Sequence, residues 1–203
     1  MARTRLGYIG EVQRKIAAKK PVLIGVFCSG NGDRSPLAHA VLQKTFERAG
    51  FTNVRIFSFG TSVSPAKHHG PASDRTTSHA KEMGYDLGRH RRRHLSDEDV
   101  QRDIQRADLL LAISPSHAAL AAEYSADEAP NAHEPILEKT WTLKGFANKT
   151  EWTRPFRWRL ARGLALKDPY FHPRTPAGEE KFRRDLRAVE AAAKKAVIRL
   201  LKK

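Results

Sequence analysis

The chain has 203 residues, 40% of them hydrophobic, so it is long enough for one domain with a sizeable core and too short for two full ones. Its single cysteine, Cys28, excludes an internal disulfide framework and a zinc site built from several cysteines. No apolar stretch has the length of a membrane span, and the basic segment 1–20 lacks the continuous apolar core of a secretory signal. We therefore expect a cytoplasmic protein without membrane contact.

The formal net charge is +15 and the isoelectric point is near 10.3. Such an excess of positive charge attracts anionic partners, among them nucleic acid, an acidic protein or a phosphorylated substrate. A basic enzyme without a dedicated anionic partner would have the same balance. Charge alone therefore does not select among these classes of protein.

Apolar periodicity and chain-breaking residues predict alternating helices and strands. In chain order we expect a helix within 1–20, a strand at 22–27, a helix at 36–49, a strand at 54–59, a helix at 76–83, a helix capped by Ser96 and a strand at 108–114. Further on we expect a short helix at 117–124, an exposed turn at 126–135, a fourth strand at 136–141 and a long amphipathic helix at 176–203. This order predicts an α/β fold with a doubly wound, four-stranded parallel sheet flanked by helices.

A loop rich in small residues joins the first strand to the helix that Pro36 opens. Its glycines and Asn31 can adopt positive φ values, which turn successive N–H groups toward one point. The N-terminus of the following helix adds a partial positive charge. The loop is thus predicted to bind phosphate through Ser29, Gly30, Asn31, Gly32, Asp33 and Ser35.

A thiol at the start of this loop and a guanidinium at its end point to covalent chemistry on phosphorus. The loop and Arg34 favour the thiolate of Cys28, and Arg34 can bind two phosphate oxygens at once. Ser35 could donate a hydrogen bond to the sulfur when it leaves. The best candidate for a general acid is Asp168, because Pro169 fixes its turn and Tyr170 could wall the pocket.

The segment CSGNGDRSP resembles the phosphate loop of the low-molecular-weight protein tyrosine phosphatases, usually read as C-x-G-N-x-C-R-S-P. Four further segments are similar to that family in the right order, namely 58–61, 84–91, 107–112 and 168–170. The resemblance implies a phosphatase-type loop after the first strand and catalysis without a metal or cofactor. By the same resemblance, Cys28 is the nucleophile, Arg34 clamps the phosphate and Asp168 is the acid.

The resemblance also implies supporting residues. Asn31 would hold the left-handed turn of the loop, Ser58 and His90 would join it in a network beneath the loop, and Tyr170 would support the acid. His90 begins a basic run, 90–94, which equally suits a phosphate-contacting patch or a solvated face.

Two loop positions depart from the family pattern. Asp33 replaces the usual second cysteine, so a disulfide with the nucleophile cannot form, and its charge opposes the thiolate and the phosphate unless a Lys or Arg neutralises it. Gly32 stands where the family usually has a side chain that helps to choose substrates. With no side chain, Gly32 does not indicate the substrate.

The resemblance covers about 21–113 and resumes at 167. We expect a single low-molecular-weight phosphatase-like domain over 1–203, with a helical extension at 1–20 and a divergent basic and aromatic insertion at about 117–166. The insertion could bind nucleic acid by stacking and phosphate contacts. We favour instead that its tryptophans, Trp141, Trp152 and Trp158, pack over the core.

Taken together, the sequence predicts a phosphomonoester hydrolase with a phosphocysteine intermediate and a phosphorylated protein, chiefly phosphotyrosine protein, or another anionic molecule as partner. A phosphatase-like fold that only binds anions or nucleic acid, with weak catalysis, is the competing class. A phosphoarginine phosphatase and an arsenate reductase are further alternatives. The reductase would need a thiol from elsewhere, because Cys28 has no second cysteine beside it in this chain.

Overall fold

The computed structural model describes residues 5–128, 133–149 and 165–202. Four parallel strands form one sheet in the order β2-β1-β3-β4: β1 (Val22–Cys28), β2 (Val54–Gly60), β3 (Leu109–Ala112) and β4 (Thr140–Thr142). The expected four-stranded parallel sheet is confirmed.

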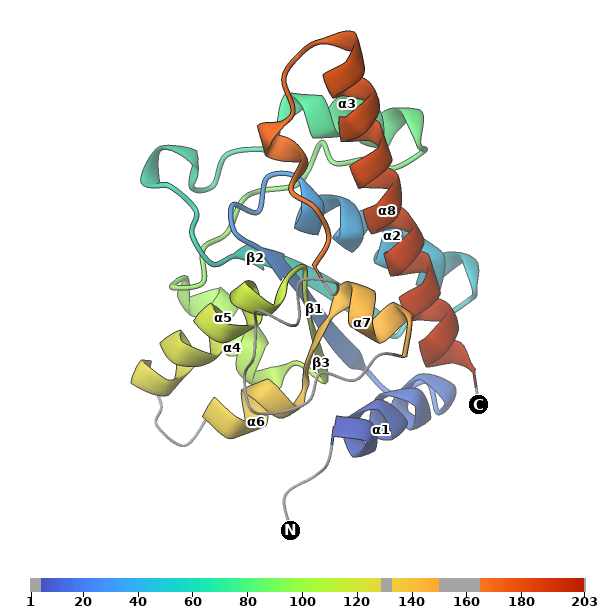
Figure 1. The fold of residues 1–203 in the computed structure, drawn as a ribbon. Helices are drawn as coiled ribbons and strands as arrows, with labels where there is room; N and C mark the ends of the chain where they lie inside the picture. The colour runs from blue at the N-terminus through green and yellow to red at the C-terminus, as the bar shows by residue number, and fades with distance from the viewer. Residues whose placement is uncertain (1–4, 129–132, 150–164, 203) are drawn as a thin grey trace.

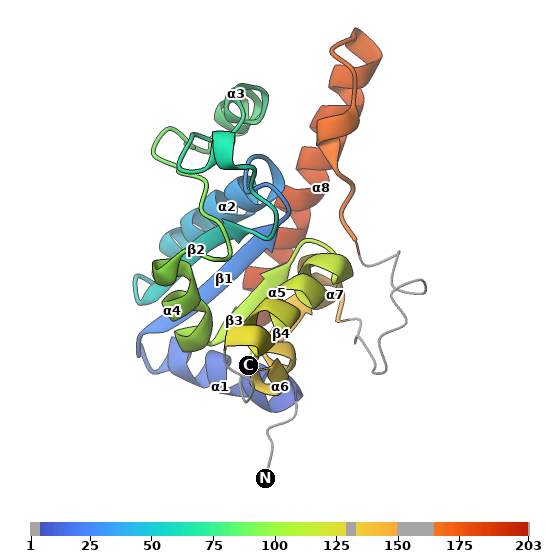
Figure 2. The same ribbon diagram turned by 90° about the vertical axis from the view of Figure 1, so that its left-hand side faces the viewer.

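Helices cover both faces of this sheet (Figures 1 and 2). They are α1 (Arg5–Ala17), α2 (Arg34–Arg48), α3 (Asp74–Glu82), α4 (Glu98–Arg106), α5 (Pro115–Glu128), α6 (His133–Glu138), α7 (Leu143–Ala147) and α8 (Pro176–Leu201), with short 3₁₀ turns η1 (Pro65–Lys67) and η4 (Pro169–Phe171). One core cluster contains residues of α1, α2, α7 and α8, and the other contains residues of α4, α5 and α6.

The central strand β1 alternates between these two clusters, as a strand buried on both faces must. Val26 and Cys28 lie in the cluster with α2 and α8, whereas Phe27 between them lies in the cluster with α4 and α5. Gly25 is required by close packing, because an added Cβ would lie 2.7 Å from side-chain atoms of Leu110 and Phe57.

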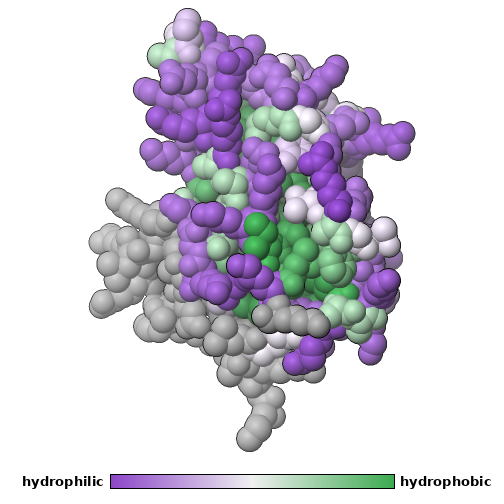
Figure 3. Space-filling view, turned by 90° about the vertical axis from the view of Figure 1, so that its right-hand side faces the viewer, coloured by the Kyte–Doolittle hydropathy of each residue, from purple (hydrophilic) through white to green (hydrophobic). Residues whose placement is uncertain are grey.

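The long C-terminal helix α8 packs on α2 with the predicted apolar stripe. All of its members are buried: Phe182, Leu186, Val189, Ala193, Val197 and Leu200. Thr175 caps the helix by accepting a hydrogen bond from the N–H of Gly178 at 3.2 Å. Figure 3 looks onto the side where α8 lies in Figure 1, and hydrophobic residues gather in the middle of that face with hydrophilic ones around them.

The region before β4 differs from the prediction. Residues 126–135 were expected to form an exposed turn, but α5 continues to Glu128 and α6 begins at His133. The fourth strand is correspondingly shorter than 136–141, because Ile136 belongs to α6 and its carbonyl accepts a hydrogen bond from the Thr140 hydroxyl. Trp141 on this strand is 1% exposed, whereas Trp152 and Trp158 lie outside the described residues.

The predicted cap at Ser96 is also wrong by one residue. Asp97 is the N-cap of α4, and the Ser96 hydroxyl instead bonds Nδ1 of His94 at 2.7 Å. Asp97 accepts a hydrogen bond from the N–H of His94 at 2.8 Å, which fixes the turn there. No helix in the described part of the chain is both long enough and apolar enough to cross a membrane.

Candidate active site

The phosphate-type loop lies at the carboxyl end of the central strand. Cys28 is the last residue of β1, which pairs with β2 on one side and with β3 on the other. The direction of strand order changes at this point, and parallel α/β sheets place their ligand sites there. α2 begins at Arg34, so its N-terminus faces the same crevice.

A chain of buried polar contacts fixes the nucleophile candidate. Sγ of Cys28 lies 3.0 Å from Oγ of Ser35, and Nδ2 of Asn31 donates to the same Oγ at 2.9 Å. Cys28 is 2% exposed, and Asn31 and Ser35 are fully buried. The loop sequence therefore folds back so that α2's first turn supports the sulfur.

Asn31 takes the left-handed conformation that the sequence predicts for it, with φ of 45°. Gly30 and Gly32, for which the sequence also allows a positive φ, do not adopt one. Its Oδ1 accepts a hydrogen bond from the N–H of Arg93 at 3.0 Å, and Nε2 of His90 lies 3.0 Å from its carbonyl oxygen. Burial lowers the pKa of His90 to about 4, so the ring is neutral at pH 7 and Nε2 carries the proton that it donates.

Ser58 departs from the predicted network. Its hydroxyl lies 3.2 Å from Nδ1 of His39, a residue of α2, and its described contacts do not include Asn31. Burial lowers the pKa of His39 to about 4. Ser58 therefore connects β2 to α2 rather than to the loop residue Asn31, because the strand directs this side chain toward the helix.

Arg34 connects the loop to the distant C-terminal segment. Its Nη2 forms an ion pair with Oδ2 of Asp168 and donates to Oγ of Ser29 at 3.4 Å, while Nη1 donates to the Leu166 carbonyl at 3.3 Å. Asp168 is the N-cap of η4 and accepts a hydrogen bond from the N–H of Tyr170 at 3.1 Å. Figure 1 shows this segment passing beside the loop after β1.

These groups surround one cavity of about 310 Å³. Its lining contains Cys28, Ser29, Gly30, Gly32, Asp33, Arg34, Ser62, Ser64, Lys67, Ser73, Arg92, Asp168, Tyr170 and Phe171. The structure thus brings the three predicted catalytic residues together, with Asn31, Ser35 and His90 behind the loop. Tyr170 and Phe171 are 62% and 80% exposed, so they form an outer aromatic wall rather than a closed lid.

The two unusual loop residues have specific neighbours. The Asp33 carboxylate accepts hydrogen bonds from the hydroxyls of Ser73 and Thr76 at the beginning of α3, so hydroxyls rather than a Lys or Arg hold its charge. Gly32 lies under Arg92: an added Cβ would be 2.9 Å from its Cζ.

Sequence reasoning missed several residues of this site. Lys67 lines the cavity and belongs to no motif. Arg92 also lines it and lies in the basic run 90–94, for which the sequence leaves open a phosphate-contacting patch or a solvated face. His117 lies near Arg34 but outside the cavity lining, and it is 7% exposed. Burial, followed by the charge of Arg34, lowers its pKa to about 3, and its Nδ1 has no hydrogen-bond partner among the described residues. His117 lies in the first turn of α5, and no sequence motif there marks it as functional.

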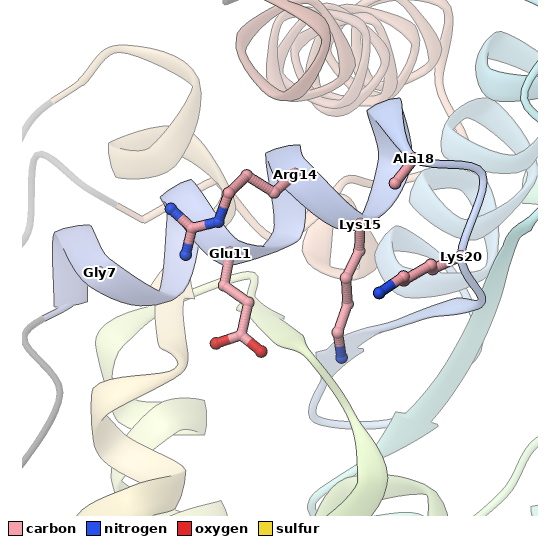
Figure 4. A pocket seen from close by; sticks show the side chains of 6 residues that line it. All are labelled: Gly7, Glu11, Arg14, Lys15, Ala18 and Lys20. Atoms are coloured by element: carbon pink, nitrogen blue, oxygen red, sulfur yellow. The ribbon is translucent and has the colours of Figure 1, made fainter.

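Other candidate sites lie away from the loop. A cavity of about 540 Å³ beside α1 is lined by Gly7, Glu11, Arg14, Lys15, Ala18 and Lys20 (Figure 4), a set without a cysteine, a serine or a histidine. One group with metal-ligating atoms within 4.8 Å of one another, His68, His69 and Asp97, lies outside the cavity lining. In this group Nε2 of His68 already lies 2.9 Å from Oδ1 of Asp97.

Comparison with known families agrees with this geometry. The family model described as low molecular weight phosphotyrosine protein phosphatase matches residues 23–203. The fold and this match make the protein a phosphatase. The chain belongs to the low molecular weight phosphotyrosine protein phosphatase family. A comparison with curated protein sequences gave no match.

Several solved structures share the fold. A mutant YwlE arginine phosphatase with a phosphorylated active-site serine has 21% sequence identity and a TM-score of 0.67, covering 90% of this chain and 97% of its own. A low molecular weight protein tyrosine phosphatase from T. tengcongensis has 23% identity and a TM-score of 0.61, covering 87% and 98%. Vibrio vulnificus Wzb, in complex with benzylphosphonate, has 23% identity and a TM-score of 0.59, covering 85% and 94%.

Proposed function

We propose that this phosphatase hydrolyses phosphomonoesters of proteins, with phosphotyrosine as the substrate and a phosphocysteine at Cys28 as the intermediate. The observation that carries the proposal is the meeting of Cys28, Arg34 and Asp168 at one cavity, although Asp168 lies 134 positions beyond Arg34 in sequence. The mutant YwlE arginine phosphatase with a phosphorylated active-site serine supports covalent transfer on this fold.

In the first step two oxygens of the substrate phosphate accept hydrogen bonds from the planar guanidinium of Arg34. The thiolate of Cys28 attacks phosphorus, the S–P bond forms and the bond from phosphorus to the ester oxygen breaks. The leaving oxygen takes a proton from Asp168, which begins the step as the neutral acid.

In the second step the Asp168 carboxylate takes a proton from water, and the water oxygen attacks phosphorus. The S–P bond breaks and inorganic phosphate leaves. Ser35, 3.0 Å from the sulfur, donates a hydrogen bond to the departing thiolate. The acid is thereby restored for the next cycle.

The cavity wall supports an aromatic ester as substrate. Tyr170 and Phe171 present exposed rings at the cavity, and their planes are perpendicular with centroids 5.5 Å apart. A phenyl ring fits against such a wall in an edge or offset arrangement. The cations Arg92 and Lys67 in the same lining would repel the charged guanidinium of phosphoarginine.

The test is hydrolysis of p-nitrophenyl phosphate and of matched phosphotyrosine, phosphoserine and phosphoarginine peptides by the whole chain. We expect turnover of the aryl phosphate, preference for the phosphotyrosine peptide, and loss of turnover in Cys28→Ser with retained binding of inorganic phosphate. Activity that survives Cys28→Ser would exclude the mechanism. Anion binding without turnover in the parent chain would identify a binding module instead.

A further inference from the structure

Because Gly32 has no side chain, the guanidinium of Arg92 can lie directly over the phosphate loop. A Cβ on Gly32 would meet Cζ and Nη1 of Arg92 at 2.9 Å and Nη2 at 3.0 Å, so the plane of the guanidinium lies directly over this loop residue. Arg92 therefore occupies the space that a side chain at position 32 would fill. Both residues line the same cavity as Cys28, so Arg92 contributes a positive charge to that cavity.

Backbone contacts hold Arg92 in this place. Its Nε donates to the Pro71 carbonyl at 2.7 Å, its N–H donates to the Gly70 carbonyl at 2.8 Å, and its own carbonyl accepts from the N–H of His69 at 2.9 Å. These bonds fix the stem and leave both Nη groups for another partner. Within the described ranges, no carboxylate forms an ion pair with Arg92.

Lys67 supplies a second cation to the same cavity. It ends η1, and its Nζ lies 5.5 Å from the centroid of the Tyr170 ring on the aromatic wall. It too has no acidic partner in the part of the chain that the structure describes. The two carboxylates of the lining are already engaged, Asp168 with Arg34 and Asp33 with Ser73 and Thr76.

We propose that Arg92 and Lys67 form a second anion subsite beside the phosphate loop, so that the enzyme prefers phosphoester substrates with a further negative charge next to the phosphoryl group. This inference rests on the proposed function. A guanidinium with two free Nη groups binds carboxylate or phosphate bidentately, and Lys67 adds a point charge. The neighbouring anion is either an acidic residue flanking the phosphorylated one or a second phosphate on the same peptide.

The experiment compares three phosphotyrosine peptides that differ only beside the phosphotyrosine, where they carry glutamate, glutamine or phosphoserine. We expect kcat/KM for the glutamate peptide to exceed that for the glutamine peptide by about tenfold at low salt, through KM, with the advantage falling as salt rises. The kcat/KM of the glutamate peptide and of the phosphoserine peptide are each divided by that of the glutamine peptide. A larger quotient for the phosphoserine peptide would identify a second phosphate as the preferred anion, and a larger quotient for the glutamate peptide would identify a carboxylate.

The variants locate the effect. Arg92→Ser should bring the glutamate-to-glutamine ratio close to one, and Lys67→Met should lower it partly. Arg91→Ser is the matched control, because it removes the same charge at the neighbouring position. The Arg91 side chain bonds the Gly88 and His90 carbonyls and lies outside the cavity lining. A ratio near one in the parent chain, or a ratio that Arg92→Ser leaves unchanged, would overturn the subsite.

Binding separates this inference from the proposed function. The Kd values of the same peptides for Cys28→Ala, measured by calorimetry, give the glutamate-to-glutamine ratio without turnover. A parent chain that hydrolyses p-nitrophenyl phosphate but shows no ratio in either measurement refutes the subsite alone. A chain without turnover whose binding ratio depends on Arg92 refutes the proposed function alone.

Discussion

Arg34 and Asp168 form an ion pair across the cavity, although they lie 134 residues apart in the sequence. Arg34 is 6% exposed, and its guanidinium contacts Ser29 of the loop, the Leu166 carbonyl and Asp168. The proposed phosphate clamp and the proposed acid thus contact each other directly. In the proposed mechanism, a phosphate that enters the loop competes with Asp168 for the donors of Arg34, and this competition releases Asp168 to act on the ester oxygen.

Asp168→Asn removes both the ion pair and the proton donor. We expect hydrolysis of an aryl phosphate with a poor leaving group to slow by about 10² to 10⁴, and p-nitrophenyl phosphate to be affected much less. Inorganic phosphate should bind several-fold more tightly, because its competitor for Arg34 is gone. Steady-state kinetics and product inhibition measure both effects. Asp86→Asn, at an exposed turn carboxylate, is the control, and equal slowing of both esters would remove Asp168 from the acid role.

Asn31→Ala tests the support of the loop. The change removes the bonds to Ser35 and Arg93 and leaves a non-glycine residue at positive φ without its side-chain contacts. We expect a loss of about 2–4 kcal/mol in the free energy of unfolding, from two buried hydrogen bonds and their stranded partners. Urea unfolding measures it. Asn53→Ala, which removes one exposed bond to Lys20, should cost under about 1 kcal/mol, and equal losses would contradict the network.

Gly60→Ala and Gly30→Ala form a matched pair within the site. A Cβ on Gly60 would lie 2.4 Å from the Ser29 carbonyl oxygen and 3.0 Å from the Asn31 nitrogen, so the phosphate loop itself must shift. We expect Gly60→Ala to cost about 1–3 kcal/mol in stability and to reduce phosphate affinity. Gly30 has open space where its Cβ would be, so Gly30→Ala should change the stability little. Urea unfolding would contradict the account if the two variants lost the same stability.

Three buried histidines predict acid sensitivity. Burial is the main cause that lowers the pKa of His39 and His90 to about 4 and that of His117 to about 3, and nearby positive charges are a smaller cause. In the unfolded chain these rings titrate near about 6.5. Between the two values the unfolded state binds more protons, so the stability is complete above about pH 6.5 and is lost as the pH falls toward 4.

The lowering of the pKa of His39 and of His90 from 6.5 to about 4 corresponds to about 3 kcal/mol for each ring. His39→Gln should therefore flatten the fall in unfolding free energy between about pH 6.5 and pH 4, measured by urea titration at several pH values. His69→Gln, at an exposed ring, serves as the control. An unchanged slope in His39→Gln would show that the ring is not neutral in the folded protein.

Much of the site could be predicted because its parts are local in sequence. The loop from Cys28 to Ser35 joins a buried strand to a helix N-terminus, and its glycines and Asn31 are typical of an anion-binding loop at that position. Asp168 was found from its turn and its aromatic neighbours. The sheet followed from the apolar runs, whose alternation matches the two core clusters.

The rest depended on tertiary contacts that a sequence does not display. Arg91, Arg92 and Arg93 are equivalent in sequence, yet Arg91 bonds local carbonyls, Arg92 lies over Gly32 and Arg93 pairs with Asp99. The family resemblance assigns Ser58 to the loop network, whereas its contact with His39 depends on the packing of α2 on β2, which the sequence does not display. The roles of the catalytic residues and the extent of the insertion at 117–166 stay predictions.

The most direct test of the phosphocysteine intermediate is the mass, during turnover, of the peptide that contains Cys28. Asp168→Ala should still transfer a phosphoryl group from p-nitrophenyl phosphate, because that leaving group needs little protonation, but should release it slowly without its base. Rapid quenching and peptide mass spectrometry should then find one phosphoryl group on the peptide that contains Cys28, and none on that peptide in Cys28→Ala. Steady turnover with no phosphoryl group on Cys28 at any time would contradict the phosphocysteine mechanism.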